Sequence, residues 1–85
     1  MNGWEEKDHF LVKTFAFSNF VYAFTFMTRV ATMAEKMEHH PWWEKSHHTV
    51  IIRLTTTTGN ENCITQKDVD RAGTIDELYD SMQKR

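Results

Sequence analysis

The sequence predicts an α+β fold in which helices pack on one face of a mainly antiparallel sheet. Two runs rich in aromatic and β-branched residues, at residues 10–17 and 49–57, are typical of strands. A long apolar pattern at helical spacing begins between them at Phe20, and a second helical pattern follows them. The order strand, helix, strand, helix leads us to expect one small domain over residues 1–85.

The first strand is expected over residues 10–17. Because side chains alternate along a strand, Leu11, Phe15 and Phe17 share one face. A short strand over residues 4–7 is expected to pair with it as a hairpin.

The long helix is expected over residues 20–38, with Ser18 or Asn19 as its N-cap. Its apolar surface is wider than one stripe, because further apolar residues flank the row that keeps the 3,4 spacing. That row consists of Phe20, Phe24, Met27, Ala31 and Ala34. An 85-residue chain is too short to cover so much apolar surface. We therefore expect a homotetramer with this helix at its centre, and sheets joined across a dimer edge.

Pro41 ends the helical region, because the residue before a proline disfavours the α conformation, and a loop is expected to follow it. The second clear strand is expected over residues 49–57, and a turn or loop over residues 59–62. Along this strand Val50, Ile52 and Leu54 point to one face.

The final helix is expected to start at Thr65, where Asp68 three residues later completes a capping box. Its inner stripe is Val69, Ala72, Ile75, Tyr79 and Met82.

Composition argues against several classes of function. The net charge is −2, from 10 basic and 12 acidic residues without a basic run, so we expect no direct nucleic-acid binding. There is no stretch of 18 apolar residues, and we expect no membrane partner. The only cysteine, Cys63, cannot form an internal disulfide, and we interpret it as half-buried packing. The polar N-terminus is unlike a signal peptide, so a cytoplasmic location is expected, with a nuclear or organellar one left open.

Two adjacent histidines, His39 and His40, fall where the helix ends and Pro41 begins a loop. Imidazoles are well suited to moving protons near neutral pH. Glu35 lies four residues before His39, on the same face while the helix persists. The alternative to a catalytic role is that both histidines are solvated side chains at a helix end. A metal site joining this pair to His47 and His48 is disfavoured, because adjacent histidines rarely converge on one ion, and we expect no metal.

Residues 35–41, with the preceding run at 26–31, resemble the pterin-4a-carbinolamine dehydratases, also known as the dimerisation cofactor of a homeodomain transcription factor. Gly3 and Trp4, the aromatic run at 15–17 and Asp68 with Ala72 also match that family. The resemblance covers nearly the whole chain. The family's usual N-terminal helix would precede Gly3, and we expect this domain to lack it.

The resemblance implies loss of water from a 4a-hydroxytetrahydropterin to give quinonoid dihydropterin, with no metal or organic cofactor. It makes His39 the leading acid/base residue and His40 the residue that orients the pterin. Glu35 and Glu38 match acidic positions that support the site, Glu35 as a catalytic residue and Glu38 in substrate binding.

The resemblance also implies a set of substrate-binding residues: Trp4, Glu38, Pro41, Trp42, Thr56, Thr57 and Thr58. The threonines would act mainly through backbone groups at a strand end. For Trp42 and Trp43 two interpretations are open, packing in the protein and stacking on the pterin. We expect one of the two rings to pack and the other to line the site, without assigning which. Packing against the strand is an equal alternative for Trp4.

One position departs from the family. A further histidine is expected eighteen residues after His39, where this sequence has Thr57, and the loop before the final helix is about two residues longer. Threonine cannot serve as an acid or base near pH 7.

The resemblance and this departure leave two candidate functions. The first is a dehydratase that recycles a pterin cofactor for an aromatic amino-acid hydroxylase pathway. The alternative is a low-activity member that acts as a pterin-binding or protein-binding module, like a transcription cofactor.

Overall fold

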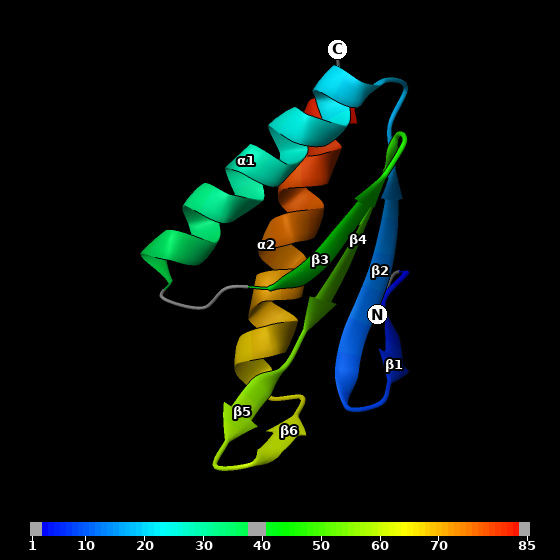
Figure 1. Cartoon of the computed structure of the whole chain (residues 1–85). Coiled ribbons are helices and arrows are strands. Elements are labelled where there is room, and N and C mark those ends of the chain that lie inside the picture. Colours follow the sequence, from blue (N-terminus) through cyan, green and yellow to red (C-terminus); the bar gives the residue numbers. More distant parts are fainter. Residues whose placement is uncertain (1–2, 38–40, 84–85) are drawn as a thin grey trace.

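Two helices cover one face of a four-stranded antiparallel sheet in the computed structural model, which describes residues 3–37 and 41–83 (Figure 1). In chain order the elements are β1 (Glu5–Lys7), β2 (Phe10–Ala16), α1 (Phe20–Lys36), β3 (Trp42–Ser46), β4 (Thr49–Leu54), β5 (Thr56–Thr58), β6 (Glu61–Cys63) and α2 (Gln66–Gln83). The sheet order is β1-β2-β4-β3, and β5 and β6 form a separate two-stranded sheet. The predicted α+β class is confirmed.

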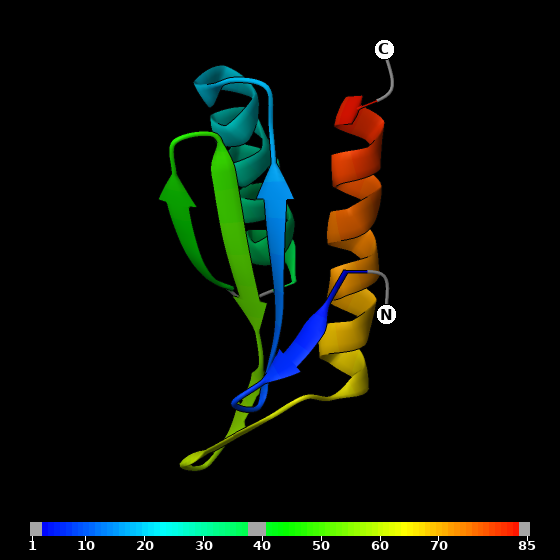
Figure 2. The same ribbon diagram turned by 90° about the vertical axis from the view of Figure 1, so that its right-hand side faces the viewer.

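The centre of the sheet is the antiparallel pair β2 and β4, in which Leu11 lies opposite Leu54 and Phe15 opposite Val50. These four side chains are buried on the face that the helices cover. Figure 2 shows both helices on that side of the sheet. The predicted hairpin between β1 and β2 is also confirmed, with Glu6 opposite Leu11.

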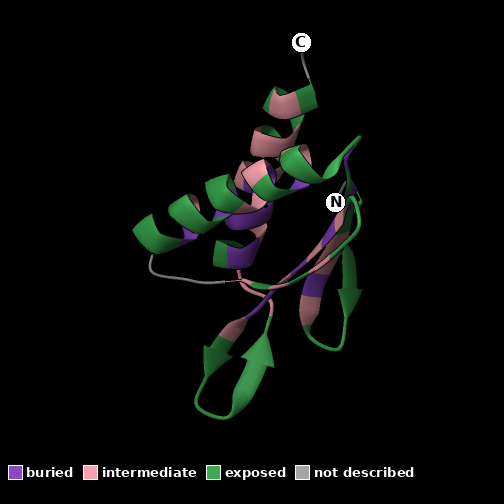
Figure 3. Cartoon of the chain, turned by 45° about the horizontal axis from the view of Figure 1, so that its top comes forward, coloured by how far each residue is buried: buried purple, intermediate pink, exposed green. Residues whose placement is uncertain are grey.

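Helix α1 begins after Asn19, whose side-chain oxygen accepts a hydrogen bond from the Tyr22 N–H at 2.9 Å. It ends at Lys36, two residues before the predicted end. Its inner face is fully buried and consists of Ala23, Phe26, Val30 and Ala34. Phe20 and Phe24, the first two members of the predicted row, point outward instead and are each more than half exposed, whereas Ala34 of that row is buried; the outer side of α1 is largely exposed (Figure 3). The helix therefore has one apolar face on its own sheet and a second one in solvent.

Helix α2 lies against β2, while α1 lies against β4. The predicted capping contact is present, since the Asp68 carboxylate accepts the Thr65 N–H at 3.0 Å. Ala72 and Ile75 are buried, and the Tyr79 hydroxyl donates to the Ala16 carbonyl oxygen at 2.8 Å. Neither α1 nor α2 is long and apolar enough to cross a membrane.

The prediction of one continuous strand over residues 49–57 is wrong, because the chain leaves the main sheet at Thr55. The Thr55 side chain is buried, and its hydroxyl lies 2.9 Å from the His9 carbonyl oxygen and 3.3 Å from that of Cys63. These contacts turn the chain so that β5 pairs with β6 (Figure 1). The predicted loop over residues 59–62 is accordingly shorter, since β6 already starts at Glu61.

The loop expected after Pro41 is also wrong, because residues 42–46 form the edge strand β3. Trp42 pairs with Arg53 and Ser46 with Thr49. An edge strand that is exposed on one face tolerates charged residues. In β3, Glu44 and Lys45 interrupt the apolar pattern from which a strand would be predicted.

Candidate functional site

The central residues of the predicted site, Glu38, His39 and His40, lie outside the described residues. The described chain approaches them from two sides. Glu35 is exposed in the last turn of α1, and Pro41 is half-buried immediately before β3. The candidate site is therefore bounded by the C-terminal end of α1 and the start of β3.

The two tryptophans after Pro41 point to opposite faces of the sheet. Trp42 lies on the face away from the helices, where its side chain is 68% exposed and meets the Phe10 ring edge-on at 6.5 Å. Trp43 is half-buried and packs against the core. Of the two interpretations, packing thus belongs to Trp43, and Trp42 is the ring that a ligand can reach.

Trp4 lies at the other edge of the sheet, directly before β1. Its ring is buried and meets Phe15 edge-on at 5.9 Å. The indole N–H is 3.1 Å from both carboxylate oxygens of Asp76, which also binds the Lys13 ammonium at 2.7 Å. Since β1 and β3 are opposite edge strands, the structure does not bring Trp4 and Trp42 together, and the contacts of Trp4 support the packing interpretation.

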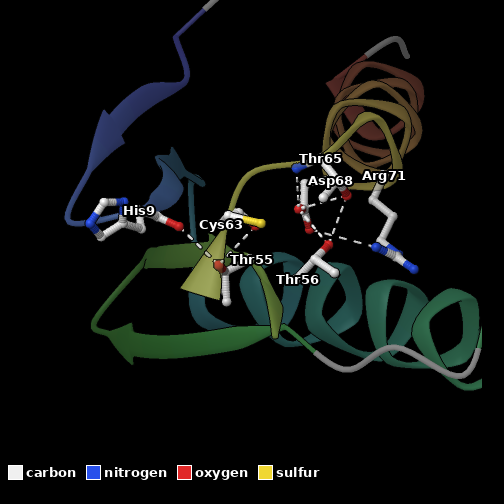
Figure 4. Close-up of polar contacts among 7 residues, drawn as sticks. All are labelled: His9, Thr55, Thr56, Cys63, Thr65, Asp68 and Arg71. Carbon is white, nitrogen blue, oxygen red and sulfur yellow. Dashed lines mark hydrogen bonds and ion pairs between the residues drawn. The ribbon is translucent and has the colours of Figure 1, made fainter. Parts of the chain in front are cut away.

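The threonine run is anchored to the first turn of α2 through a buried carboxylate. The Thr56 hydroxyl donates to Asp68 at 2.8 Å and lies 2.8 Å from the Thr65 hydroxyl (Figure 4). Asp68 is fully buried. Thr57 and Thr58 are exposed, and the Thr57 hydroxyl donates to the Asn62 side-chain oxygen at 2.7 Å. Asp68 therefore holds the strand end in place, while the next two threonines face solvent.

Arg71 is the residue at this site that the sequence interpretation missed. It is 7% exposed, and its Nη1 lies 3.6 Å from the Asp68 carboxylate. Its Nε and Nη1 are buried without a hydrogen-bond partner. The available signal was the spacing of Asp68 and Arg71, three apart on one helix face, where opposite charges meet.

A groove of about 480 Å³ lies between α1 and α2, next to the last turn of α1. Met33, Met37 and Leu78 contribute apolar side chains to it, and Arg29 and Lys36 contribute charge. Such a volume suits a small molecule. Among the described residues that line this groove, none is a carboxylate or an imidazole, the usual groups for acid/base chemistry at neutral pH.

Fold and site together define a small α+β domain with a polar cluster between β5 and α2. A histidine pair follows α1 in its sequence. The family model described as "Pterin 4 alpha carbinolamine dehydratase" matches residues 1–78. The chain belongs to this family. A Prochlorococcus marinus protein (strain MIT 9312) provisionally named pterin-4-alpha-carbinolamine dehydratase is 42% identical over 78 residues, covering 92% of this chain and 79% of the relative. One from strain MIT 9313 is 45% identical, covering 89% and 77%.

Solved structures share the fold. The transcriptional coactivator/pterin dehydratase from Brucella melitensis superposes with a TM-score of 0.83 at 31% identity, covering 92% of this chain and 83% of the other. A pterin dehydratase-like protein identified as a RuBisCO assembly factor in the alpha-carboxysome superposes with a TM-score of 0.74 at 23% identity, covering 89% and 86%. At that identity the second likeness shows the fold alone.

Proposed function

We propose that this protein is a dehydratase that removes water from a 4a-hydroxytetrahydropterin to give the quinonoid dihydropterin. Family membership over residues 1–78 supports this. The observation that carries it is the combination of the Glu35, His39 and His40 motif with a strand end that Asp68 anchors through Thr56. We assign the reaction to the recycling of a pterin cofactor used by an aromatic amino-acid hydroxylase.

The reaction needs one acid and one base. The bond between C4a and its hydroxyl oxygen breaks, and the oxygen leaves as water after it takes a proton from an acid. N5 gives its proton to a base, and the electrons of that N–H bond form the C4a=N5 double bond. In this proposal His39 transfers protons, His40 orients the ring, and Glu35 and Glu38 support the two imidazoles.

The substrate is proposed to lie along the exposed end of β5, near Pro41 and Trp42. Thr57 and Thr58 are exposed there and can present backbone groups to the amide edge of the pterin. The Trp42 ring is exposed and available for stacking. Because the Thr57 hydroxyl cannot ionise near pH 7, proton transfer depends on the histidine pair.

A spectrophotometric assay of 4a-hydroxytetrahydropterin dehydration, with and without the protein, tests this function. We expect catalysis by the wild type and a loss of about 100- to 10,000-fold in His39→Ala, the usual range for acid/base groups. In His40→Ala the Michaelis constant should rise instead. His48→Ala is the matched control, because His48 is an exposed histidine in the turn between β3 and β4. Wild-type rates in His39→Ala would contradict the assignment of roles.

The second candidate function is a protein-binding module, which the outer face of α1 favours. The Phe20 and Phe24 rings stack with centroids 5.9 Å apart, and Val21 beside them is 65% exposed. Exposed apolar surface of this kind marks interaction sites. We assign this face first to a homotetramer of the chain. Pterin binding without catalysed dehydration would favour the module over the enzyme.

A further inference from the structure

The groove between α1 and α2 is used neither by the proposed chemistry nor by the outer face of α1 that carries Phe20 and Phe24. It lies along the second half of α1, from Thr28 to Met37, where Figure 1 shows this helix diverging from α2. Its volume of about 480 Å³ is in the range of cavities that hold small ligands. There is thus room for a small molecule between the two helices.

The walls of the groove are mainly apolar. Met33 and Met37 line it from α1, and Leu78 lines it from α2. The lining threonines of α1 add little polarity, because the hydroxyls of Thr28 and Thr32 each donate to a carbonyl oxygen four residues earlier, at 3.0 Å in both cases. Methionine side chains are flexible and adapt to apolar groups of different shape. The groove is therefore suited to an apolar chain.

The charge along the groove has one sign. Arg29 and Lys36 line it from α1, both are exposed, and the other described lining residues are uncharged. The two cations are seven positions apart, which is about 10 Å along a helix. Long basic side chains extend apolar surface with their methylene groups while their charged ends stay in water. A ligand with an apolar body and a negative charge complements both properties of this lining.

We propose that the groove binds an anionic amphiphile, a single acyl chain that ends in a carboxylate. The chain lies over Met33, Met37 and Leu78, and the carboxylate pairs with the cations of Arg29 and Lys36. The pterin is a poorer match, because a flat ring with several donors and acceptors needs polar partners that the described lining does not offer. The inference is therefore independent of the proposed dehydration.

Decanoate is the probe, and NMR of the methionine methyl groups is the readout. Met33 and Met37 line the groove, whereas Met27 and Met82 pack against the core and serve as internal controls. We expect decanoate, below its critical micelle concentration, to shift the Met33 and Met37 signals saturably and to leave the other two unchanged. Decyltrimethylammonium has the same chain with the opposite charge, and it should bind at least about fivefold more weakly because two cations repel it.

Variants of the two cations complete the test. The double variant Arg29→Gln/Lys36→Gln should bind decanoate about three- to tenfold more weakly, the range expected for two exposed ion pairs. Lys67→Gln is the matched control, because Lys67 is an exposed lysine of α2 outside the groove, and it should bind like the wild type. Equal affinity for the two probes, or for the wild type and the double variant, would overturn the proposal.

Two other occupants give different results. Met33 and Met37 signals that move on dilution of the protein without ligand would assign the groove to a second copy of the chain. Saturable shifts of the same two signals with 7,8-dihydrobiopterin would assign it to the pterin. Either result would overturn the amphiphile site, whereas the rate assay of dehydration tests the proposed function separately.

Discussion

The Thr56 hydroxyl donates a hydrogen bond of 2.8 Å to the fully buried carboxylate of Asp68. This bond joins β5 to the first turn of α2 across twelve residues of sequence. The same carboxylate accepts the Thr65 N–H at 3.0 Å and pairs with Arg71 at 3.6 Å. Asp68 therefore has two roles, as the cap of α2 and as the anchor of the strand end that carries Thr57.

The first prediction is that Thr56→Val destabilises the fold. Valine has nearly the same shape but cannot donate to Asp68, and a buried charged acceptor that loses a partner costs about 1–3 kcal/mol. Thr58→Val is the matched control, because Thr58 is exposed on the same strand. Urea unfolding followed by tryptophan fluorescence measures both. Equal midpoints for the two variants would show that the bond contributes nothing to stability.

The second prediction concerns two glycines. A Cβ built on Gly73 meets no other atom within 4 Å, and Gly73 lies inside α2. Gly73→Ala should therefore stabilise the protein by about 0.5–1 kcal/mol, because alanine loses less conformational freedom in a helix. Gly59 has equal space but a φ of +63°, so Gly59→Ala should destabilise it. Thermal unfolding distinguishes the two, and a shift of the same sign in both would contradict the argument.

The third prediction is that the outer face of α1 holds the chain in an assembly. Phe24 is 56% exposed, and placing a carboxylate there with Phe24→Asp would bury a charge in any interface formed by this face. We expect the wild type to scatter light as a tetramer at micromolar concentration and the variant to have a lower mass. Ser81→Asp, an exposed position on α2, is the control and should remain a tetramer. A monodisperse wild-type monomer would refute the prediction.

The fourth prediction concerns Thr57. The 4a-hydroxyl can lie on either face of the pterin, and an acid/base on one side reaches only one of the two epimers well. We expect the wild type to discriminate between the epimers and Thr57→His to accelerate the slower one. Thr58→His is the matched control, because successive side chains of β5 point to opposite faces. Separate assays of each epimer decide the matter. Equal wild-type rates, unchanged in Thr57→His, would mean that a third histidine is dispensable.

Much of the fold could be predicted from local patterns. The alternation of Leu11, Phe15 and Phe17 identified the buried face of β2, and all three side chains are buried, although Phe17 lies just after the end of the strand. Asn19 and Asp68 identified the starts of the two helices, because capping depends on residues three apart. The family could also be inferred from the residues at 26–31 and 35–41, and the family model confirms it. The roles of His39 and His40 stay predictions.

Other features were decided by contacts between distant parts of the chain. The strand break at Thr55 depends on the His9 carbonyl oxygen, which is 46 positions away, and the threonine run itself carries no sign of it. Trp4 is buried because Asp76 and Phe15 surround it, although nothing near Trp4 in sequence requires this.

The same distinction holds for the candidate site. The sequence by itself determined the chemical types available, a histidine pair, nearby carboxylates and a threonine in place of a third histidine. Only the tertiary structure decided that Arg71 is buried beside Asp68 and that Trp43 rather than Trp42 packs inward. The physical reason is that periodicity and capping are set by neighbours within a few residues, whereas burial and ion pairing depend on which surfaces meet after the chain has folded.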